Sequence, residues 1–296
     1  MLTNPLAWVF LLLPGTFVGL GVVSILHHGG HRHFSRNDWI NSLWVQVACP
    51  VGLWVGHWGL KHRVHHRFPA AYPDDPFTSA STLFRFHPSA PHKIYHRWQH
   101  YYVLLAYTTY WIIDQASQLT FLVTGSTYGR HGLRMKGRWP GYCWEKACFA
   151  LTIAPYLYFF GVGFVERFFV TVTIGSLAAS ILVSMNHISL GARVAEQHSD
   201  WRQIVADSTV NYSIDSTMIG FLSGGLNTHS VHHLMPNETR ANMRSLHRQL
   251  LETVDDECIT FSSMLDAVRA HFAALKWLGK GETGSLIGGD VQHVRR

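Results

Sequence analysis

Charged residues are scarce in this chain of 296 residues, where Asp, Glu, Lys and Arg make up 14% of the sequence. A soluble domain usually carries about 25%. Apolar residues make up 47%. This balance excludes a heavily charged surface and favours a protein that sits in a membrane. The alternative is a soluble protein with a large helical core.

The chain also lacks the cysteine motifs and phosphate-binding motifs that would indicate a function. The four cysteines form no C-x-x-C pair, which excludes a disulfide framework and a thiolate zinc site. Neither G-x-x-x-x-G-K-S/T nor a strand-linked G-x-G-x-x-G occurs. The formal net charge of +6 is spread along loops without an interleaved aromatic patch. We therefore expect no nucleic-acid partner, and we attribute the positive charge to attraction by anionic lipid headgroups.

Histidine, in contrast, is abundant and clustered. Residues 62–66 and 229–233 both have the spacing H-x-x-H-H, and residues 27–33 contain four further histidines. Positions i, i+3 and i+4 of a helix share one face, so each H-x-x-H-H motif directs three imidazoles toward one point. His187 follows an apolar segment and adds one more. Isolated histidines such as His131, His198 and His293 are expected to have no ligand role.

The number of histidines indicates the kind of metal site. Imidazole suits zinc, copper, iron and nickel, so the ligand type alone does not select the metal. A single zinc ion takes four ligands, and the eight or nine candidate histidines are too many for it. A two-metal site with open positions for a small oxidant fits the number better.

Several apolar stretches approach the ~20 residues that cross a bilayer: Leu6–Leu26, Trp39–Gly56, Tyr102–Thr124, Ala147–Phe164 and Phe168–Met185. Ligands of one metal centre must lie on one side of the membrane. We therefore expect residues 39–56, which two histidine clusters flank, to be re-entrant or interfacial. By the same argument one later stretch does not cross, and we choose residues 102–124, which contain Asp114, Gln115 and Gln118.

Residues 147–164 and 168–185 would then form a tight hairpin with Glu166 and Arg167 at the far turn. Basic residues near the histidine clusters place that side in the cytoplasm by the positive-inside rule: Lys61, Arg63, Arg67, Arg85, Arg130, Arg134, Lys136 and Arg138. The predicted fold is an all-α, multi-pass integral membrane protein. Its transmembrane and interfacial helices lie under a cytoplasmic helical cap that holds the metal site.

The chain resembles the membrane fatty acid desaturases in its motifs. His28-Gly-Gly-His-Arg-His33 is similar to the first histidine box of acyl-CoA desaturases, and residues 58–66, followed by Asp75-Pro76, are similar to the second. Residues 203–212 and 220–227, leading into the third box and Leu234-Met-Pro, resemble the acyl-lipid and front-end branch. The resemblance covers about residues 19–275.

The resemblance implies an O2-dependent desaturase with two iron ions, a fatty acyl substrate, lipid- or coenzyme A-linked, and no catalytic side chains beyond the metal ligands. No cytochrome b5-like H-P-G-G motif occurs, so electrons are expected from a separate carrier of ferredoxin or cytochrome b5 type. Carried over position by position, the metal ligands are His28, His33, His62, His65, His66, His187, His229, His232 and His233.

Some features leave alternatives open. His27 and His31 also fit a first box of the acyl-lipid type, so either pair is a candidate. Val183 occupies the place of a water-bridging asparagine in the acyl-CoA branch, and Asn186 or Asn227 could replace it. Candidate aromatic linings of an acyl tunnel are Trp44, Trp54, Phe77, Tyr158 and Phe160, although ordinary packing is the alternative for each.

Two other functions share part of this pattern. A di-iron membrane hydroxylase would use the same boxes, but Asp75-Pro76 and Gly224-Gly-Leu-Asn227 favour desaturation. A histidine-rich metal transporter would place polar residues near the middle of its spans, whereas these histidines lie at the ends of apolar segments. We predict one domain over residues 1–278 and a flexible tail over residues 279–296.

Overall fold

This computed structural model describes residues 5–31, 35–46, 51–79, 81–125, 137–193, 200–253, 258–284 and 287. It is mostly helical and contains one small sheet. The chain divides into two compact units, each built from separate stretches. Unit 1 comprises Met1–Leu60, Leu105–Thr127 and Leu133–Ser180, and unit 2 comprises Lys61–Leu104, Tyr128–Gly132 and Ile181–Arg296. The predicted boundary between a domain at 1–278 and a tail stays a prediction.

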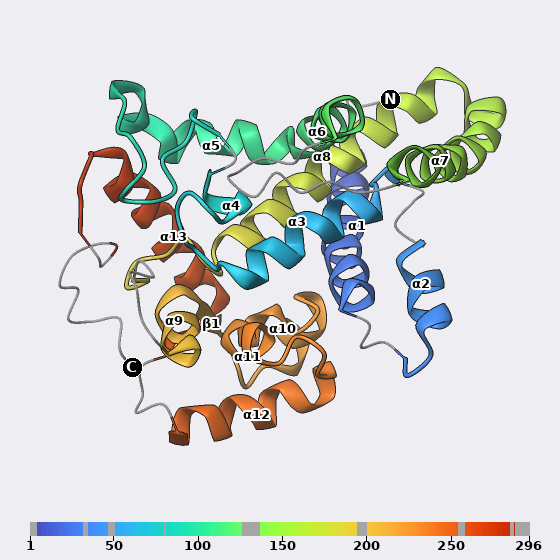
Figure 1. Ribbon diagram of the computed structural model, residues 1–296. Helices are drawn as coiled ribbons and strands as arrows, with labels where there is room; N and C mark the ends of the chain where they lie inside the picture. The colour runs from blue at the N-terminus through green and yellow to red at the C-terminus, as the bar shows by residue number, and fades with distance from the viewer. Residues whose placement is uncertain are drawn as a thin grey trace. The chain divides into compact units, whose positions relative to one another are not determined.

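Unit 1 consists of long apolar helices and one short amphipathic helix (Figure 1). Its elements are α1 (Pro5–Gly30), α2 (Asp38–Gln46), the start of α3 (Val55–Arg67), the end of α5 (Gln99–Thr108), α6 (Tyr110–Thr124), α7 (Arg138–Phe160) and most of α8 (Val162–Ser184). Within the described residues one helix, α8, is both long and apolar enough to cross a bilayer. Further crossings stay a prediction.

Helices α1 and α8 approach each other at glycines. A Cβ atom on Gly19 would lie 2.2 Å from the carbonyl oxygen of Gly175, so the two backbones are in contact there. Small residues permit this close packing, which is typical of helix pairs in membranes. Helix α7 in turn exposes large apolar side chains such as Leu151 and Tyr158. An exposed apolar surface of this kind suits contact with lipid.

The hairpin of the last two apolar stretches turns earlier than predicted. Helix α7 ends at Phe160 and is capped by Gly161, whose φ of +54° is accessible mainly to glycine; α8 begins at Val162. Tyr156 stacks on Phe164 across this turn, with ring centroids 5.2 Å apart. Glu166 and Arg167 lie inside α8. Their placement at the turn was wrong, because the backbone freedom of a glycine outweighed the polarity of the Glu-Arg pair.

The segment Tyr102–Thr124 is not one helix, since α5 ends at Thr108 and α6 begins at Tyr110. Its polar residues face the interior of unit 1. Gln118 Nε2 donates to Asp114 Oδ2 at 2.6 Å, and Gln115 Nε2 donates to the Gly52 carbonyl at 2.9 Å. The amide N–H groups of Gln115 and Gln118 therefore donate hydrogen bonds within the protein, so their polarity gives no argument against a membrane location. Whether the segment crosses stays a prediction.

The segment Trp39–Gly56 also contains two helices. Helix α2 has nine residues, far fewer than a bilayer crossing requires, and it exposes Trp39, Ile40 and Leu43. Residues 47–50 lie outside the described part of the chain. A short helix with exposed apolar side chains agrees with the expectation that this segment is interfacial or re-entrant.

Unit 2 packs short helices around a two-stranded parallel sheet. Its further elements are α4 (Pro76–Ser79), η2 (Ile94–Trp98), α9 (Trp201–Ser208), β1 (Val210–Tyr212), α10 (Thr217–Leu222), η3 (Leu226–Thr228), α11 (His229–Leu234), α12 (Arg240–Thr253), β2 (Ile259–Phe261) and α13 (Met264–Gly279). Val210 pairs with Ile259 and Tyr212 with Phe261. Helix α12 runs along the outer side of α11 (Figure 1). The sheet is a small exception to the predicted all-α class.

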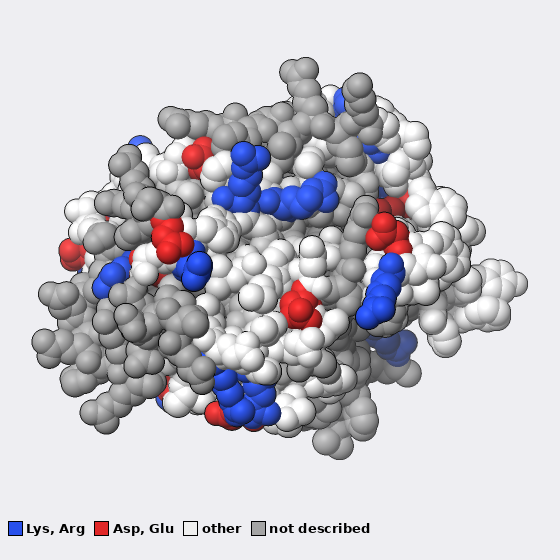
Figure 2. Space-filling model, turned by 60° about the horizontal axis from the view of Figure 1, so that its bottom comes forward, with Lys and Arg blue, Asp and Glu red and all other residues white. Residues whose placement is uncertain are grey.

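The last described residue, Ile287, is buried and exchanges backbone hydrogen bonds with Gly191 and Ala192. The predicted flexible tail is therefore attached to unit 2 at this point. On the face drawn in Figure 2, Lys and Arg side chains form small separate groups, several of them beside Asp or Glu.

Candidate metal centre

The second histidine box lies on α3, as its spacing predicted. The first turn of α3 is held by Glu145, whose Oε2 accepts from the backbone N–H of Val55 at 2.7 Å. A carboxylate at a helix N-terminus accepts a hydrogen bond from a backbone N–H that has no partner within the helix, and it interacts favourably with the positive end of the helix dipole. Two to three turns further on, the helix carries His62, His65 and His66. Nε2 of His62 and Nε2 of His66 lie 3.2 Å apart, as expected for positions i and i+4.

The third box lies on α11, which follows the turn at Gly224 and Gly225 and the short helix η3. Both glycines have positive φ values, +63° and +84°, which side chains with a Cβ rarely adopt. The helix is then tied to β1 through Ser230. Its backbone N–H donates to Asn211 Oδ1 at 3.0 Å, and its hydroxyl accepts from Asn211 Nδ2 at 2.8 Å. The turn and this pair of bonds together orient His229, which is buried.

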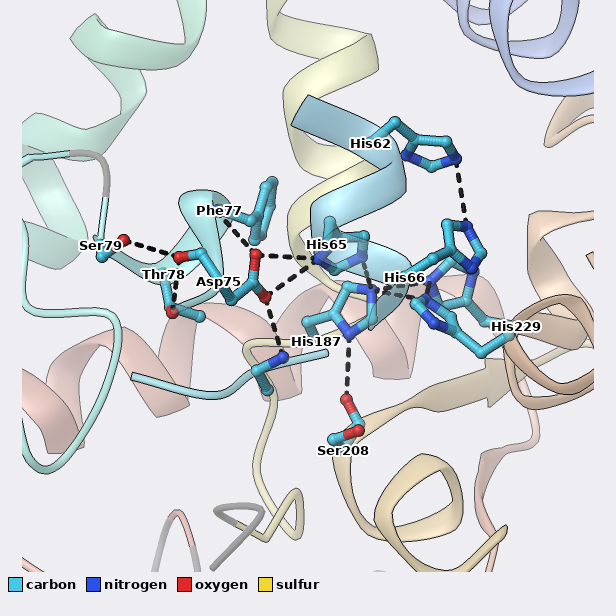
Figure 3. A network of polar contacts seen from close by, with 12 residues as sticks. His62, His65, His66, Asp75, Phe77, Thr78, Ser79, His187, Ser208 and His229 are labelled. Atoms are coloured by element: carbon cyan, nitrogen blue, oxygen red, sulfur yellow. Dashed lines mark hydrogen bonds and ion pairs between the residues drawn. The ribbon is translucent and has the colours of Figure 1, made fainter. Parts of the chain in front are cut away.

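His187 stands on the segment that follows α8 and is buried. Its Nδ1–H donates to the carbonyl oxygen of Ser208 at 3.0 Å, which directs Nε2 toward the histidine boxes (Figure 3). The next residue is also fixed, because His271 Nδ1 donates to the carbonyl of Ile188 at 2.6 Å. A single histidine outside any box is thus held as firmly as those on helices.

Four buried imidazoles converge in unit 2, and their ligand atoms lie within 4.8 Å of one another: His65, His187, His229 and His233. His187 Nε2 is 2.9 Å from Nε2 of His65, 2.8 Å from that of His229 and 3.3 Å from that of His233. Nitrogens at right angles around an ion with bonds of about 2.1 Å are about 3.0 Å apart. The observed spacing fits one metal ion.

The tautomers of this group are also compatible with a bound cation. Asp75 accepts from His65 Nδ1–H, and a carbonyl accepts from His187 Nδ1–H. In the neutral imidazoles both Nε2 atoms therefore carry lone pairs, which repel at 2.9 Å. Burial and the neighbouring histidines lower the pKa values of His187 and His233, which favours their neutral forms. A metal ion between the lone pairs would relieve the repulsion.

Asp75 contacts this histidine group from outside, at the ring nitrogen of His65 that faces away from the other histidines. Its side chain is fully buried, and each carboxylate oxygen lies 3.0 Å from His65 Nδ1. The backbone N–H groups of Ala70 and Phe77 donate to the same carboxylate at 2.8 Å (Figure 3). Four contacts therefore fix the carboxylate, which in turn fixes the ring of His65. Metal-bound histidines commonly donate their second N–H to such a group.

A second group forms beside the first. Nε2 of His66 lies 3.2 Å from that of His62 and 2.8 Å from that of His232, so both boxes contribute to it. His66 also stacks on His233 of the first group, with ring centroids 4.3 Å apart. The seven predicted ligands that belong to unit 2 are thus brought together as two adjacent groups.

The first histidine cluster belongs to unit 1, where α1 carries His27 and His28. The side chain of His28 and all of His33 lie outside the described residues. The rings of His27 and His31 are 5.2 Å apart and one helical turn apart. The choice between these two pairs as ligands stays a prediction.

Asn186 and Asn227, the two candidates for a water-bridging asparagine, differ in their hydrogen-bond partners. The amide of Asn227 contacts Ser223 and Ser213. The amide of Asn186 is fully buried and has no hydrogen-bond partner among the described residues. A buried amide without a partner is costly unless a water or an ion satisfies it. Asn186 is therefore the stronger candidate for a polar role beside His187.

The structure also distinguishes among the aromatic residues that were candidates for lining an acyl tunnel. Phe77 lies 5.7 Å from His65 and 6.0 Å from His187 between ring centroids, and it stays a candidate. Trp54 is buried in the core of unit 1. Tyr158 and Phe160 are 84% and 61% exposed, so their assignment to a tunnel lining was wrong. Their apolar rings face outward because α7 presents this face to the surroundings.

The chain is similar to known fatty acid desaturases over most of its length. Residues 3–264 match the family model described as "Fatty acid desaturase". An "sn-1 linoleoyl-lipid 6-desaturase" of Arthrospira platensis is 24% identical, covering 91% of this chain and 77% of the relative. An "Acyl-lipid omega-13 desaturase" of Chlamydomonas reinhardtii is 23% identical over 89% of this chain and 60% of the relative. "Fatty acid desaturase 3" of Bos taurus is 25% identical over 74% and 49%, respectively. No solved structure matches.

Proposed function

Because this chain belongs to the fatty acid desaturase family, we propose that it is an O2-dependent oxidoreductase that introduces a double bond into the acyl chain of a membrane lipid. The observation that carries the proposal is the convergence of seven histidines from three separate parts of the chain on two adjacent points. Such a site suits a pair of metal ions better than a single structural ion.

We infer that the two ions are iron. One ion would be held by His65, His187, His229 and His233, and the other by His62, His66 and His232. The family resemblance adds a pair of first-cluster histidines as further ligands, His28 and His33 or His27 and His31. When bound, a reduced iron pair supplies O2 activation strong enough to remove hydrogen from an unactivated methylene.

The protein itself supplies orientation and a dry site. Asp75 and the Ser208 carbonyl hold the rings of His65 and His187 so that both Nε2 lone pairs face inward. Burial of His187, His229 and His233 keeps bulk water from the first group. Phe77 borders the same histidines with an apolar ring, which suits a methylene chain better than water.

A lipid-linked acyl chain is the substrate class that the comparisons favour. Two of the relatives are named for acyl chains on lipids, and the chain spans 77% and 60% of their lengths. We propose that the enzyme is a multi-pass membrane protein with its metal centre on the cytoplasmic side. Electrons would arrive from a separate carrier of ferredoxin or cytochrome b5 type.

Expression in a host of known lipid composition tests this function. Gas chromatography of fatty acid methyl esters should reveal a new unsaturated species with the wild-type chain and none with His229→Ala. Arg202→Gln, on the exposed side of α9, serves as the control and should retain the product. Hydroxylated acyl chains instead of unsaturated ones would show a hydroxylase and overturn the proposed reaction.

A further inference from the structure

A pocket outside the metal centre combines positive charge with exposed aromatic rings. It lies in unit 2 where η2 and the start of α5 meet the last turn of α13, and has a volume of about 500 Å³. Its lining residues are Arg97, Trp98, His100, Tyr101, Lys276, Lys280 and Glu282. Three basic side chains against one carboxylate leave a formal charge of +2 with His100 neutral.

The charges of this pocket are not used inside the protein. Within the described part of the chain, Arg97, Lys276 and Lys280 form no ion pair and no side-chain hydrogen bond. Surface lysines and arginines are often merely solvated, so this alone would not indicate a ligand. Here, however, two aromatic residues share the pocket: Trp98 is 52% exposed and Tyr101 is 67% exposed.

The walls of the pocket are held rigidly. Gln99 Nε2 donates to the carbonyl of Leu275 at 2.8 Å, and His92 donates to that of Gly279 at 3.0 Å. A Cβ atom on Gly279 would lie 2.2 Å from the carbonyl oxygen of His96, so the two walls are in backbone contact. The pocket therefore exists before any ligand binds, which lowers the entropic cost of binding.

Lysines in a last helical turn often serve to neutralise the negative end of the helix dipole. In α13 other donors do this. Arg85 Nη1 donates to the carbonyl of Leu278 at 2.7 Å, and Gln99 and His92 donate to two further carbonyls of the same turn. The ammonium groups of Lys276 and Lys280 are thus available to an external anion.

Cations next to exposed Trp and Tyr are the combination found at the boundary between lipid headgroups and water. An acidic protein would need a broad charged surface, whereas this pocket accommodates one small anionic group. We propose that the pocket binds the phosphate of an anionic membrane lipid, held by Arg97, Lys276 and Lys280. Trp98 and Tyr101 then lie at the level of the lipid ester groups.

The proposal depends on membrane association, which the family implies, and not on the reaction at the metal centre. It is tested with the full chain in detergent, titrated with phosphatidylglycerol and followed by native mass spectrometry of the retained lipid. Each such cation contributes about fivefold to binding, so Arg97→Gln, Lys276→Gln and Lys280→Gln together should weaken binding roughly 100-fold.

A matched triple variant controls for net charge. Arg202→Gln, Arg248→Gln and Arg269→Gln remove three exposed charges of unit 2 outside the pocket and should bind phosphatidylglycerol as the wild type does. Equal weakening in both triple variants would overturn the proposal, because it would show attraction by net charge alone. The single variant Lys280→Gln, with an expected loss of about fivefold, tests the same site if the triple variant does not fold.

Competition identifies the source of the phosphate. If inorganic phosphate or glycerol phosphate displaces phosphatidylglycerol at equal concentration, the ligand is a soluble phosphate and the lipid assignment is wrong. If only the lipid binds and Trp98→Ala weakens its binding, the assignment to a membrane lipid stands. The assay requires no turnover, so it gives a result even if the proposed desaturation fails its own test.

Discussion

Both carboxylate oxygens of Asp75 lie 3.0 Å from Nδ1 of His65, ten residues earlier in the chain. This contact and the bond from His187 to the Ser208 carbonyl determine which nitrogen of each ring faces the metal centre. The orientation of the first histidine group therefore depends on residues that hold no metal themselves.

Substitution Asp75→Asn should reduce iron retention and activity by about 10- to 100-fold, because an amide offers one acceptor oxygen in place of two and adds a donor. Iron per chain, measured by elemental analysis after dialysis, checks this. Asp200→Asn is the control, since Asp200 caps α9 and asparagine caps a helix equally well. Full iron retention by Asp75→Asn would contradict the orienting role.

Removal of one ligand from each histidine group should affect iron binding more strongly than Asp75→Asn does. His229→Ala opens the first group and His232→Ala the second. We expect both variants to hold fewer than two iron ions per chain and to lose activity by more than the 10- to 100-fold typical of an outer contact. His247→Leu replaces a buried histidine outside both groups and should keep its iron. Two retained iron ions in His229→Ala would exclude this residue as a ligand.

Substitutions of Asn186 and Asn227, the two candidates for a water-bridging asparagine, should have opposite effects on thermal stability and turnover. Asn227→Ala removes hydrogen bonds to Ser223 and Ser213 and is expected to lower the thermal midpoint, since each such bond contributes about 1 kcal/mol. Asn186→Ala removes an amide without a described partner, so it should leave the midpoint nearly unchanged and lower turnover. Thermal unfolding in detergent and product analysis of the same preparations measure both. Unchanged turnover in Asn186→Ala would exclude the polar role proposed for this residue.

Stability should fall as the pH drops from about 6.5 to about 4. Burial lowers the pKa of His87, His247 and His271 to about 4, so the unfolded chain binds more protons in this range. Each histidine contributes up to about 1.4 kcal/mol per pH unit. His247 has no hydrogen-bond partner among the described residues, and His247→Leu should be neutral or stabilising at pH 7.5.

Acid also acts on the metal ligands, but it does so in both proteins. Most of that effect therefore cancels when the free energy of unfolding of His247→Leu is compared with that of the wild type. We expect this difference to grow in favour of the variant as the pH falls below 6.5. A difference that is independent of pH would show that the buried imidazole already titrates normally. Denaturant unfolding at pH 7.5, 6.5 and 5.5 supplies the three values.

The histidine groups of unit 2 were predictable because their geometry is local. The spacing H-x-x-H-H already fixes three side chains on one helical face, and each box occupies a helix as expected. Asp75 was visible only as part of a family motif, since no spacing indicates that a carboxylate will return to His65 after a turn. The carbonyl of Ser208 carries no signal in a sequence, because every residue has one.

The errors concern features that tertiary packing decides. Glu166 and Arg167 suggested a turn by their polarity, but Gly161 provides it by its backbone. Tyr158 and Phe160 are apolar, and nothing in their pattern distinguishes an interior lining from an outward face. Likewise, polarity alone could not show that Asp114 and Gln118 bond to each other inside unit 1.

The Nε2 atoms of His66 and His232 lie 2.8 Å apart, although the two residues are 166 positions apart in the chain. During synthesis the ribosome must therefore complete nearly all of the protein before the second group exists. With the iron pair and the membrane location that we propose, iron delivery would be a late event that follows membrane insertion. Cells starved of iron should accumulate a full-length, inserted and inactive form that regains activity when iron returns, without new protein synthesis.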